Sequence, residues 1–218
     1  MKSRIVLLGA PGSGKGTQAE MITRHFAIAV TSPGTILRRE RDLGTPLGIK
    51  ADEISKQGGL VPDEIIVQLI EDWLALHGRE GFVFDGFPRT VKQGERLNEI
   101  LQKRQTALDL AIWLEVSEET VRERIAGRLQ CRRCGFTTSL TSAGFADRPI
   151  CPYCDGPLIR REDDDSSVLE TRLAEFKTKT EPLLSFYEKD DALHRIDGNR
   201  DRETVFVDIS ALIEERVR

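Results

Sequence analysis

Hydrophobic residues along the chain occur in two patterns, short runs of strand length and longer repeats of helix length. The strand-length segments lie at residues 4–8, 28–31, 82–85, 110–116 and 194–197, and most of them are largely apolar. Runs of this kind are typical of strands buried on both faces of a sheet. Helix-length patterns occupy residues 16–26, 63–77, 90–104, 165–189 and 204–217, and Ser117 has the position of an N-cap for a further helix. This alternation predicts βαβ units, and therefore an α/β fold with a parallel sheet flanked by helices.

Two segments interrupt this alternation. Residues 33–62 are polar and glycine-rich, with helix-length pieces and no strand pattern. Residues 129–160 contain all four cysteines of the chain and no long helix pattern. We therefore expect both segments to be insertions into the α/β core.

The composition narrows the class of protein. The chain has 218 residues, of which 39% are hydrophobic and 31% charged, with 32 basic against 36 acidic residues and a net charge of −4. This balance is typical of one soluble globular domain, and no apolar run approaches the roughly 20 residues that span a bilayer. The first residues also lack the pattern of a secretion signal. We expect a cytoplasmic protein with no membrane partner and no large nucleic-acid-binding face.

A glycine-rich segment carries the strongest chemical pattern. Residues 9–17 read GAPGSGKGT and lie between a predicted strand and a predicted helix, which is the context of a phosphate-binding loop. Glycines allow successive backbone N–H groups to surround a phosphate, and the start of the helix adds a partial positive charge. Lys15 would bridge the outer phosphates and Thr17 would help to hold Mg²⁺, although Gly16 stands where the general pattern has Ser or Thr. A plain glycine turn is the alternative interpretation, and the spacing favours a P-loop NTPase-type sheet.

The segment DGFPRT, residues 85–90, supplies a second pattern. It follows a predicted buried strand, and ligands of open parallel sheets bind at the carboxyl ends of the strands. Asp85 could there reach the water shell of a phosphate-bound Mg²⁺, and Arg89 could bind a phosphate with two hydrogen bonds. The alternative is a turn with an ordinary surface ion pair.

Four arginines flank the second insertion. Arg124 and Arg128 are four residues apart, which predicts that they share one face of a helix near its C-terminus. Arg161 and Arg172 bracket the start of the next predicted helix. Their guanidinium groups could stabilise a phosphoryl group during transfer, because proteins catalyse that reaction mainly by positioning and charge stabilisation. They could instead serve solvated helix faces.

The four cysteines form two CxxC pairs separated by 16 residues: Cys131, Cys134, Cys151 and Cys154. This spacing suits a tetrahedral site with four thiolate ligands, and zinc is the metal that it favours. Four protein ligands leave no open coordination position, so the metal would be structural. Iron or a pair of disulfides is the alternative.

Three of these segments together resemble the adenylate kinases and their nucleoside-monophosphate kinase relatives: residues 9–17, residues 85–90 with Gln93, and residues 124–128. The resemblance implies a core of residues 1–30, 62–128 and 161–218, a mobile monophosphate-binding segment at 31–61 and a mobile zinc-binding lid at 129–160. It also implies a monomeric enzyme that catalyses ATP·Mg + AMP ⇌ 2 ADP. No general base is needed, because the AMP phosphate is already anionic near neutral pH.

The same resemblance implies a role for individual residues. The catalytic residues would be Lys15, Asp85, Arg89, Arg124, Arg128, Arg161 and Arg172. The ATP site would contain Gly12, Ser13, Gly14, Lys15, Gly16, Thr17, Arg128, Thr137, Thr138 and Arg200. The AMP site would contain Pro33, Arg38, Gly59, Leu60, Val61, Gly86, Arg89, Gln93, Arg161 and Arg172.

The match departs from the family where the monophosphate base would bind. Pro33 stands in place of a threonine that helps to position the AMP base in the family, and Thr35 stands in place of an acid. A kinase for CMP, UMP or GMP is therefore an open alternative. Gln93 favours AMP, because its amide can both donate to and accept from an adenine edge. A third hypothesis is a nucleotide-dependent zinc-ribbon protein that binds nucleic acid, which the acidic net charge disfavours.

Overall fold

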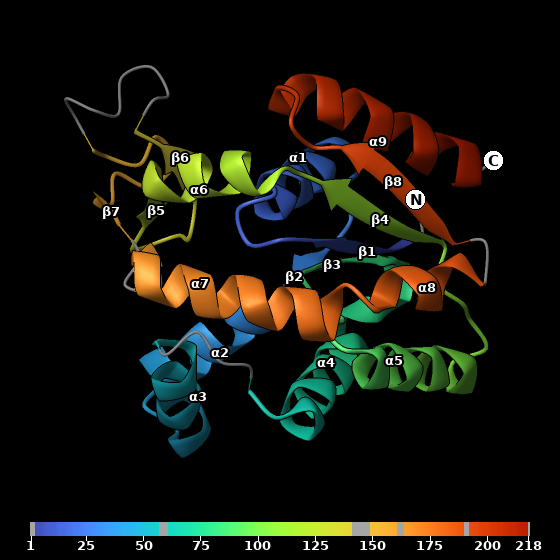
Figure 1. Cartoon of the computed structure of the whole chain (residues 1–218). Helices are drawn as coiled ribbons and strands as arrows, with labels where there is room; N and C mark the ends of the chain where they lie inside the picture. The colour runs from blue at the N-terminus through green and yellow to red at the C-terminus, as the bar shows by residue number, and fades with distance from the viewer. Residues whose placement is uncertain (1–2, 57–60, 141–148, 161–163, 190–191, 218) are drawn as a thin grey trace.

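A computed structural model describes residues 3–56, 61–140, 149–160, 164–189 and 192–217. Within these residues, the central sheet consists of parallel strands in the order β2-β3-β1-β4-β8 (Figure 1). The strands are β1 (Arg4–Gly9), β2 (Val30–Thr31), β3 (Phe82–Asp85), β4 (Leu110–Glu115) and β8 (Leu193–Asp197). The parallel sheet predicted from the sequence is confirmed.

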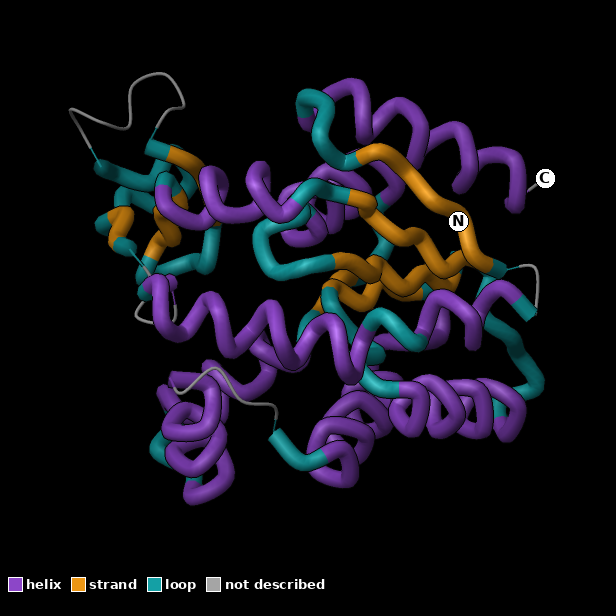
Figure 2. Tube along the Cα trace, in the orientation of Figure 1, coloured by secondary structure: helices purple, strands orange, loops and turns teal. Residues whose placement is uncertain are grey.

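Helices cover both faces of this sheet (Figure 2). The helices of the core are α1 (Lys15–Phe26), α4 (Asp63–His77), α5 (Val91–Lys103), α6 (Glu118–Ala126), α7 (Ser166–Glu175), α8 (Leu183–Glu188) and α9 (Arg202–Val217), with a short 3₁₀ turn, η1 (Gly78–Glu80). The predicted polar insertion forms α2 (Pro33–Asp42) and α3 (Pro46–Lys56). The element types expected from the sequence are therefore present at nearly the expected positions.

The alternation of side chains along β1 divides the core into two layers. Ile5 and Leu7 pack with α1 and α9 on one face of the sheet, whereas Val6 and Leu8 pack with α4, α5 and α8 on the other. All four side chains are fully buried. Because burial of one such side chain stabilises the fold by about 1.5–3 kcal/mol, β1 is the main anchor for the loop that follows it.

A second, smaller sheet lies at one end of the molecule (Figure 1). It is antiparallel, with the order β6-β5-β7, and consists of β5 (Arg128–Cys131), β6 (Thr137–Ser139) and β7 (Leu158–Ile159). Its buried side chains are Leu129, Leu158, Cys131 and Cys151. We refer to this part of the chain, residues 128–140 and 149–160, as the small sheet. It includes the described part of the predicted second insertion.

Two expectations from the sequence are wrong. Arg128 does not share a helix face with Arg124, because α6 ends at Ala126 and Arg128 is the first residue of β5. The helix expected over residues 165–189 is interrupted by a π-helical turn, η3 (Phe176–Thr180), before α8 begins. The interruption precedes Pro182, which lacks the N–H that would continue the hydrogen-bond ladder. In both cases, the pattern of polar and apolar residues does not show where one element ends and the next begins.

The predicted helix starts are confirmed in detail. The Ser117 hydroxyl accepts a hydrogen bond from the Thr120 N–H at 3.2 Å, and Asp165 accepts one from the Ser167 N–H at 3.0 Å. Both contacts satisfy backbone donors that the first turn of a helix leaves without a partner. Among the described helices, none has the length and apolar character that a membrane crossing requires.

Candidate active site

The loop between β1 and α1 has the backbone conformation of a phosphate-binding loop. Gly14 precedes α1 with φ 99°, and Gly12 has φ 78°, values that L-residues with a side chain rarely adopt. A Cβ at Gly12 would also lie 2.8 Å from Cγ1 of Ile125 on α6. Glycine is therefore required at both positions, by backbone conformation and, at Gly12, by the close approach of a neighbouring helix.

Lys15, the first residue of α1, is folded back onto this loop. Its ammonium group donates to the carbonyls of Gly9 and Ala10 at 2.9 and 2.8 Å and to the Ser13 hydroxyl at 3.3 Å. Burial lowers the pKa of Lys15 to about 8; Asp85 opposes this shift, while nearby arginines, Arg89 first among them, add to it. A buried ammonium beside several guanidinium groups is an environment that favours a multiply charged anion.

Asp85 ends β3, the strand next to β1, and lies against the start of α1. A Cβ built at Gly16 would be 3.2 Å from Oδ2 of Asp85, closer than most real Cβ contacts. Gly16, which departs from the general loop pattern, thus leaves room for this carboxylate. The Asp85 carboxylate and the Thr17 hydroxyl are oxygen donors of the type that Mg²⁺ prefers, and both residues line the same cleft.

Asp164 connects two of the predicted arginines. Its carboxylate accepts from Nε of Arg128 at 2.7 Å and from Nη1 of Arg172 at 3.4 Å, and the Asp164 side chain is only 5% exposed. The start of the small sheet is thereby joined to α7. The structure therefore pairs Asp164 with arginines on both sides.

Arg124 reaches the opposite side of the phosphate-binding loop. Its guanidinium group donates to the Ser13 carbonyl at 3.4 Å and to the Arg200 carbonyl at 3.4 Å. Burial lowers the pKa of Arg124, and Asp197 opposes this shift. The side chain therefore links α6 to the loop and to the segment between β8 and α9.

Arg89 and Arg38 line the same cleft. Nε of Arg89 donates to the Gly86 carbonyl at 2.9 Å, and the Arg89 carbonyl accepts from the Thr180 hydroxyl at 2.8 Å. Arg38, on α2, donates to the Thr35 hydroxyl at 3.2 Å. Hydrogen bonds therefore hold both arginines at the cleft, Arg38 within the predicted monophosphate-binding segment and Arg89 in the segment that follows β3.

These groups line one cleft of about 1270 Å³. Of the residues predicted for the nucleotide sites, it is lined by Gly12, Ser13, Gly14, Lys15, Gly16, Thr17, Pro33, Arg38, Val61, Asp85, Gly86, Arg89, Gln93, Arg124, Arg128, Thr137, Thr138, Arg172 and Arg200. The remaining three, Gly59, Leu60 and Arg161, lie outside the described residues. Every described residue that the sequence assigned to nucleotide binding or catalysis therefore lines the same cleft.

The four cysteines meet at the end of the small sheet. Their sulfur atoms all lie within 4.8 Å of one another, with Cys131 and Cys154 3.4 Å apart and Cys134 and Cys151 3.5 Å apart. Burial opposes ionisation of Cys131, but N–H groups of Cys134 and Arg133 that point at its sulfur lower its pKa to about 7. All four are free thiols, and the donor set is of the kind that binds zinc tetrahedrally.

Two further contacts at this cleft are not indicated by any sequence pattern. Tyr153, between the last two cysteines, accepts a hydrogen bond from Arg24 of α1 at 2.7 Å, and its ring lies 4.3 Å from the Arg24 guanidinium carbon. Asp63, at the start of α4, accepts hydrogen bonds from Thr90 and Gln93 at the start of α5. Both contacts join segments far apart in the chain, so periodicity within one element cannot reveal them.

Comparison with known proteins identifies the family. The family model described as "Adenylate kinase" matches residues 7–192. The chain belongs to the adenylate kinase family. It is 42% identical over 213 residues to an adenylate kinase of Pseudothermotoga lettingae, covering 97% of this chain and 98% of the relative. An adenylate kinase of Archaeoglobus fulgidus is 39% identical over 212 residues, with 97% and 98% covered.

A third relative is the adenylate kinase of Geobacillus sp. (strain WCH70), which is 40% identical over 210 residues and covers 96% of this chain and 97% of its own length. The family predicted from the sequence is thus confirmed, and with it an enzyme that transfers a phosphoryl group from ATP to AMP. The family explains why cationic groups from distant segments converge on one cleft.

Proposed function

We propose that the cleft binds ATP·Mg and AMP together and that Lys15 with the surrounding arginines stabilises the phosphoryl group as it moves between them. The observation that carries this proposal is the convergence of Lys15, Arg89, Arg128 and Arg172 on one cleft at the carboxyl edge of the sheet, where burial lowers the pKa of Lys15 and the three arginines add to that shift. Phosphoryl transfer requires this kind of preorganised positive charge more than a general base.

The donor nucleotide occupies the side of the cleft nearest the small sheet. Residues 12–17 surround its phosphates, with Lys15 on the outer ones. Arg124 and Arg128 contribute positive charge, and Thr137, Thr138 and Arg200 lie where the ATP base and ribose bind. The support for this placement is that all of these residues line one continuous cleft beside the phosphate-binding loop.

The acceptor AMP occupies the side formed by α2, α4 and α5. Arg38 and Arg89 bind its phosphate, Gln93 faces its base, and Pro33, Val61 and Gly86 shape the pocket. The AMP phosphate, largely dianionic above pH 6, attacks the outer phosphorus of ATP in line. Because the phosphate is already ionised, no general base is needed, and the arginine charges stabilise the group in transfer.

Mg²⁺ bound with ATP would neutralise negative charge on the phosphates during transfer. Thr17 and Asp85 provide the oxygen atoms suited to hold it or its water shell, since Gly16 lets the carboxylate approach the loop. The four cysteines are suited to a structural zinc ion, which would hold together a sheet with only two buried leucines.

The same proposal assigns residues 129–160 to a lid, residues 31–61 to a monophosphate-binding segment, and residues 1–30, 62–128 and 161–218 to the core. Asp164 and Tyr153 support it, because each links the small sheet to the core through a side-chain contact that can break and re-form. We also take the chain to act as a cytoplasmic monomer whose partners are ATP, ADP and AMP. Sedimentation at the protein concentration of the assay would test its oligomeric state.

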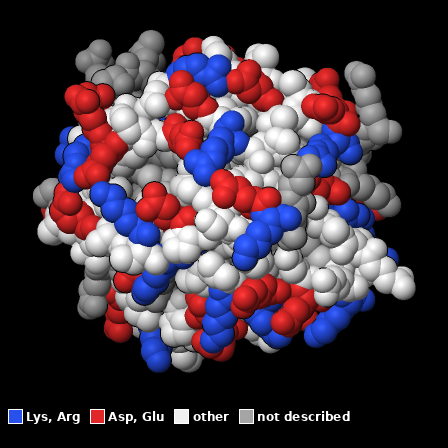
Figure 3. All heavy atoms as spheres, turned by 45° about the vertical axis from the view of Figure 1, so that its right-hand side comes forward, with Lys and Arg blue, Asp and Glu red and all other residues white. Residues whose placement is uncertain are grey.

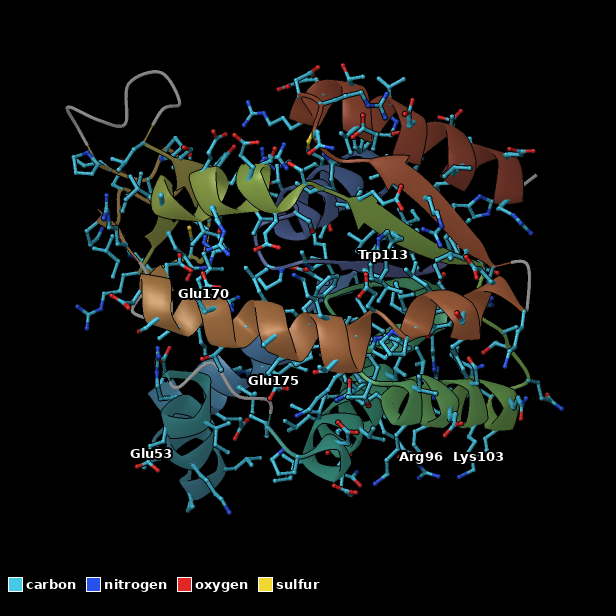
Figure 4. The ribbon with its side chains drawn as sticks, viewed as in Figure 1. Glu53, Arg96, Lys103, Trp113, Glu170 and Glu175 are labelled. Carbon is cyan, nitrogen blue, oxygen red and sulfur yellow. The ribbon has the colours of Figure 1, made fainter. Side chains whose placement is uncertain are left out.

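The experiment that tests the proposal is an ADP-formation assay with ATP·Mg against AMP, CMP, UMP and GMP in parallel. We expect turnover with AMP and little with the other acceptors. Arg89→Ala should lower kcat/KM for AMP by about 10²–10³-fold. Arg96→Ala is the matched control, since Arg96 projects from the outer side of α5 (Figure 4) and pairs with Glu99 there. Equal loss in both variants, or full activity of Arg89→Ala, would contradict the assignment.

A further inference from the structure

The side-chain amide of Gln93 is held from both ends. Gln93 is 2% exposed, and its Oε1 accepts a hydrogen bond from the backbone N–H of Arg89 at 2.7 Å. Its Nε2 donates to Oδ1 of Asp63 at 2.7 Å. Asp63 is the first residue of α4, whereas Arg89 directly precedes the N-cap of α5 and Gln93 lies in the first turn of that helix. Two separate elements therefore determine how this amide is turned.

The two partners of Gln93 allow only one orientation. A backbone N–H can only donate, and an ionised carboxylate can only accept. If the amide turned over, its NH₂ group would face the Arg89 N–H and its oxygen would face the Asp63 carboxylate. Both contacts would then be repulsive, and a buried polar group left without a partner costs about 1–3 kcal/mol.

Asp63 itself is fixed by a second donor. The Thr90 hydroxyl donates to Oδ2 of Asp63 at 2.8 Å, and its oxygen also accepts the Gln93 N–H at 3.1 Å as the N-cap of α5. The hydroxyl proton is thus committed to Asp63. Both oxygens of the carboxylate accept hydrogen bonds, so the acid cannot rotate without losing one of them.

One proton and one lone pair of the Gln93 amide remain after these contacts are counted. Because Gln93 lines the cleft, this donor and acceptor are the groups with which it can read a base. The Watson–Crick edge of adenine presents a donor, the amino group, beside the acceptor N1. Guanine presents the opposite order, an acceptor at O6 beside the donor N1–H. An amide of fixed orientation therefore complements only one of these two purines in a given pose.

We propose that Asp63 is a positioning residue that, together with the Arg89 backbone N–H, holds the Gln93 amide in the orientation that accepts adenine and rejects guanine. This inference rests on the proposed placement of the AMP base against Gln93 and goes beyond it. Asp63 does not need to touch the substrate. Asp63 instead restricts the Gln93 amide, which could otherwise present its donor and acceptor in either order, to one orientation. This restriction matters because Pro33 offers no side-chain donor for the base.

The test compares kcat/KM for AMP and for GMP at saturating ATP·Mg in four variants. Asp63→Leu removes the acceptor with little change of shape, and Asp63→Asn keeps an oxygen but adds a donor that tolerates a turned amide. Glu64→Gln is the matched control: it lies next to Asp63, removes the same charge, and its carboxylate is 70% exposed and paired with Lys92. Gln93→Leu reports whether the amide contacts the base at all.

We expect the AMP-to-GMP ratio to fall by about tenfold or more in Asp63→Leu and by about threefold in Asp63→Asn, and to be unchanged in Glu64→Gln. The change should lie mainly in the KM for AMP, while the KM for ATP stays constant. A purely structural loss would instead change both KM values or kcat. Asp63→Asn decides the outcome if thermal unfolding shows that Asp63→Leu does not fold.

A ratio that stays within twofold of wild type in a folded Asp63 variant, while Gln93→Leu lowers it, would overturn the role of Asp63 and leave the proposed AMP site intact. An unchanged ratio in Gln93→Leu would overturn the placement of the base and the inference with it. Equal use of AMP and GMP by the unaltered protein would also overturn the inference, because there would be no discrimination to explain.

Discussion

The floor of the cleft and the small sheet both present charged or polar groups to the same space, but different forces position those groups. Lys15 and Asp85 follow strands whose side chains are buried on both faces of the central sheet. The hydrophobic cluster of the small sheet has four buried residues, and two of them are cysteines. Positions on the floor therefore depend on apolar burial, whereas positions on the small sheet depend on the cysteine cluster and on side-chain contacts to the core.

The charged side chains of the two regions are also held in different ways. The surface shown in Figure 3 carries basic and acidic side chains that are interspersed, without a field of one sign. Inside the cleft, by contrast, burial and the nearby arginines lower the pKa of Lys15, and Asp164 bridges Arg128 and Arg172. The small sheet contacts the core through the buried Arg128–Asp164 pair and through the exposed Arg24–Tyr153 contact.

The largest effect is expected when the floor of the cleft is altered at Lys15. Lys15→Met should lower kcat by about 10²–10³-fold, because the variant removes a positive charge from the transferring phosphates. Its melting temperature should stay the same or rise, since methionine avoids the cost of burying an ammonium group. Steady-state kinetics and calorimetry measure both quantities.

Lys103→Met provides the control for this variant, because Lys103 projects from the outer side of α5 (Figure 4). It removes the same charge far from the cleft and should leave kcat unchanged. If Lys15→Met retained near-normal turnover, Lys15 could not have the role proposed for it.

Removal of the metal should separate the two regions. A chelator, or Cys151→Ser, should lower the melting temperature and deplete zinc from the purified protein, because the small sheet has too few apolar side chains to be stable alone. The central sheet should keep its far-ultraviolet circular dichroism at temperatures where the small sheet is already unfolded. Metal analysis and thermal unfolding monitored at two wavelengths test this.

Ile159→Ala, an exposed change on β7, is the comparison for the cysteine variant and should retain the metal. An unchanged melting profile in protein shown to be free of metal would exclude a structural metal site.

The contrast between the regions also marks what could be read from the sequence. The strands, most helices and the phosphate-binding loop were predictable, because burial on both faces and glycine spacing leave local patterns. Arg128 was misplaced onto a helix because helix periodicity continues past Gly127, where pairing of β5 with two neighbouring strands takes over. The π-helical turn at Phe176–Thr180 left no pattern that the sequence analysis recognised.

Of the site, residues that belong to contiguous motifs were found and those that act across elements were missed. Asp63 reads as an ordinary acidic residue in the first turn of a helix, where it would favour the helix dipole. Its contact with Gln93 depends on the packing of α4 against α5, which no local pattern encodes. Tyr153 was likewise overlooked beside the cysteines that flank it.

Raising the pH should have an intermediate effect on kcat/KM for ATP, through loss of the proton from Lys15 at the floor of the cleft. Lys15 must be charged to bind phosphates, and its pKa in the nucleotide-free protein is about 8. The value of kcat/KM for ATP should therefore be highest below about pH 8 and fall at higher pH as the ammonium group loses its proton. Because the unfolded chain keeps the proton up to a pKa of about 10.4, this group makes the folded protein relatively more stable as pH rises between these values.

Lys15→Arg should shift the high-pH decline upward, whatever its absolute rate, because a guanidinium group stays charged in this range. A wild-type profile that is flat up to pH 9.5 would contradict the buried, partly neutralised state of Lys15.

The smallest effect is expected at the contact between the small sheet and α1. Arg24 and Tyr153 are 53% and 54% exposed, so their hydrogen bond and ring contact should together contribute less than about 1 kcal/mol. Tyr153→Phe should raise the KM for ATP by less than about twofold, and Tyr153→Ala should raise it somewhat more. Neither should change the metal content. Loss of metal in Tyr153→Ala would mean that the ring supports the cysteine cluster itself, and the small sheet would then be held to the core by Asp164 rather than by this contact.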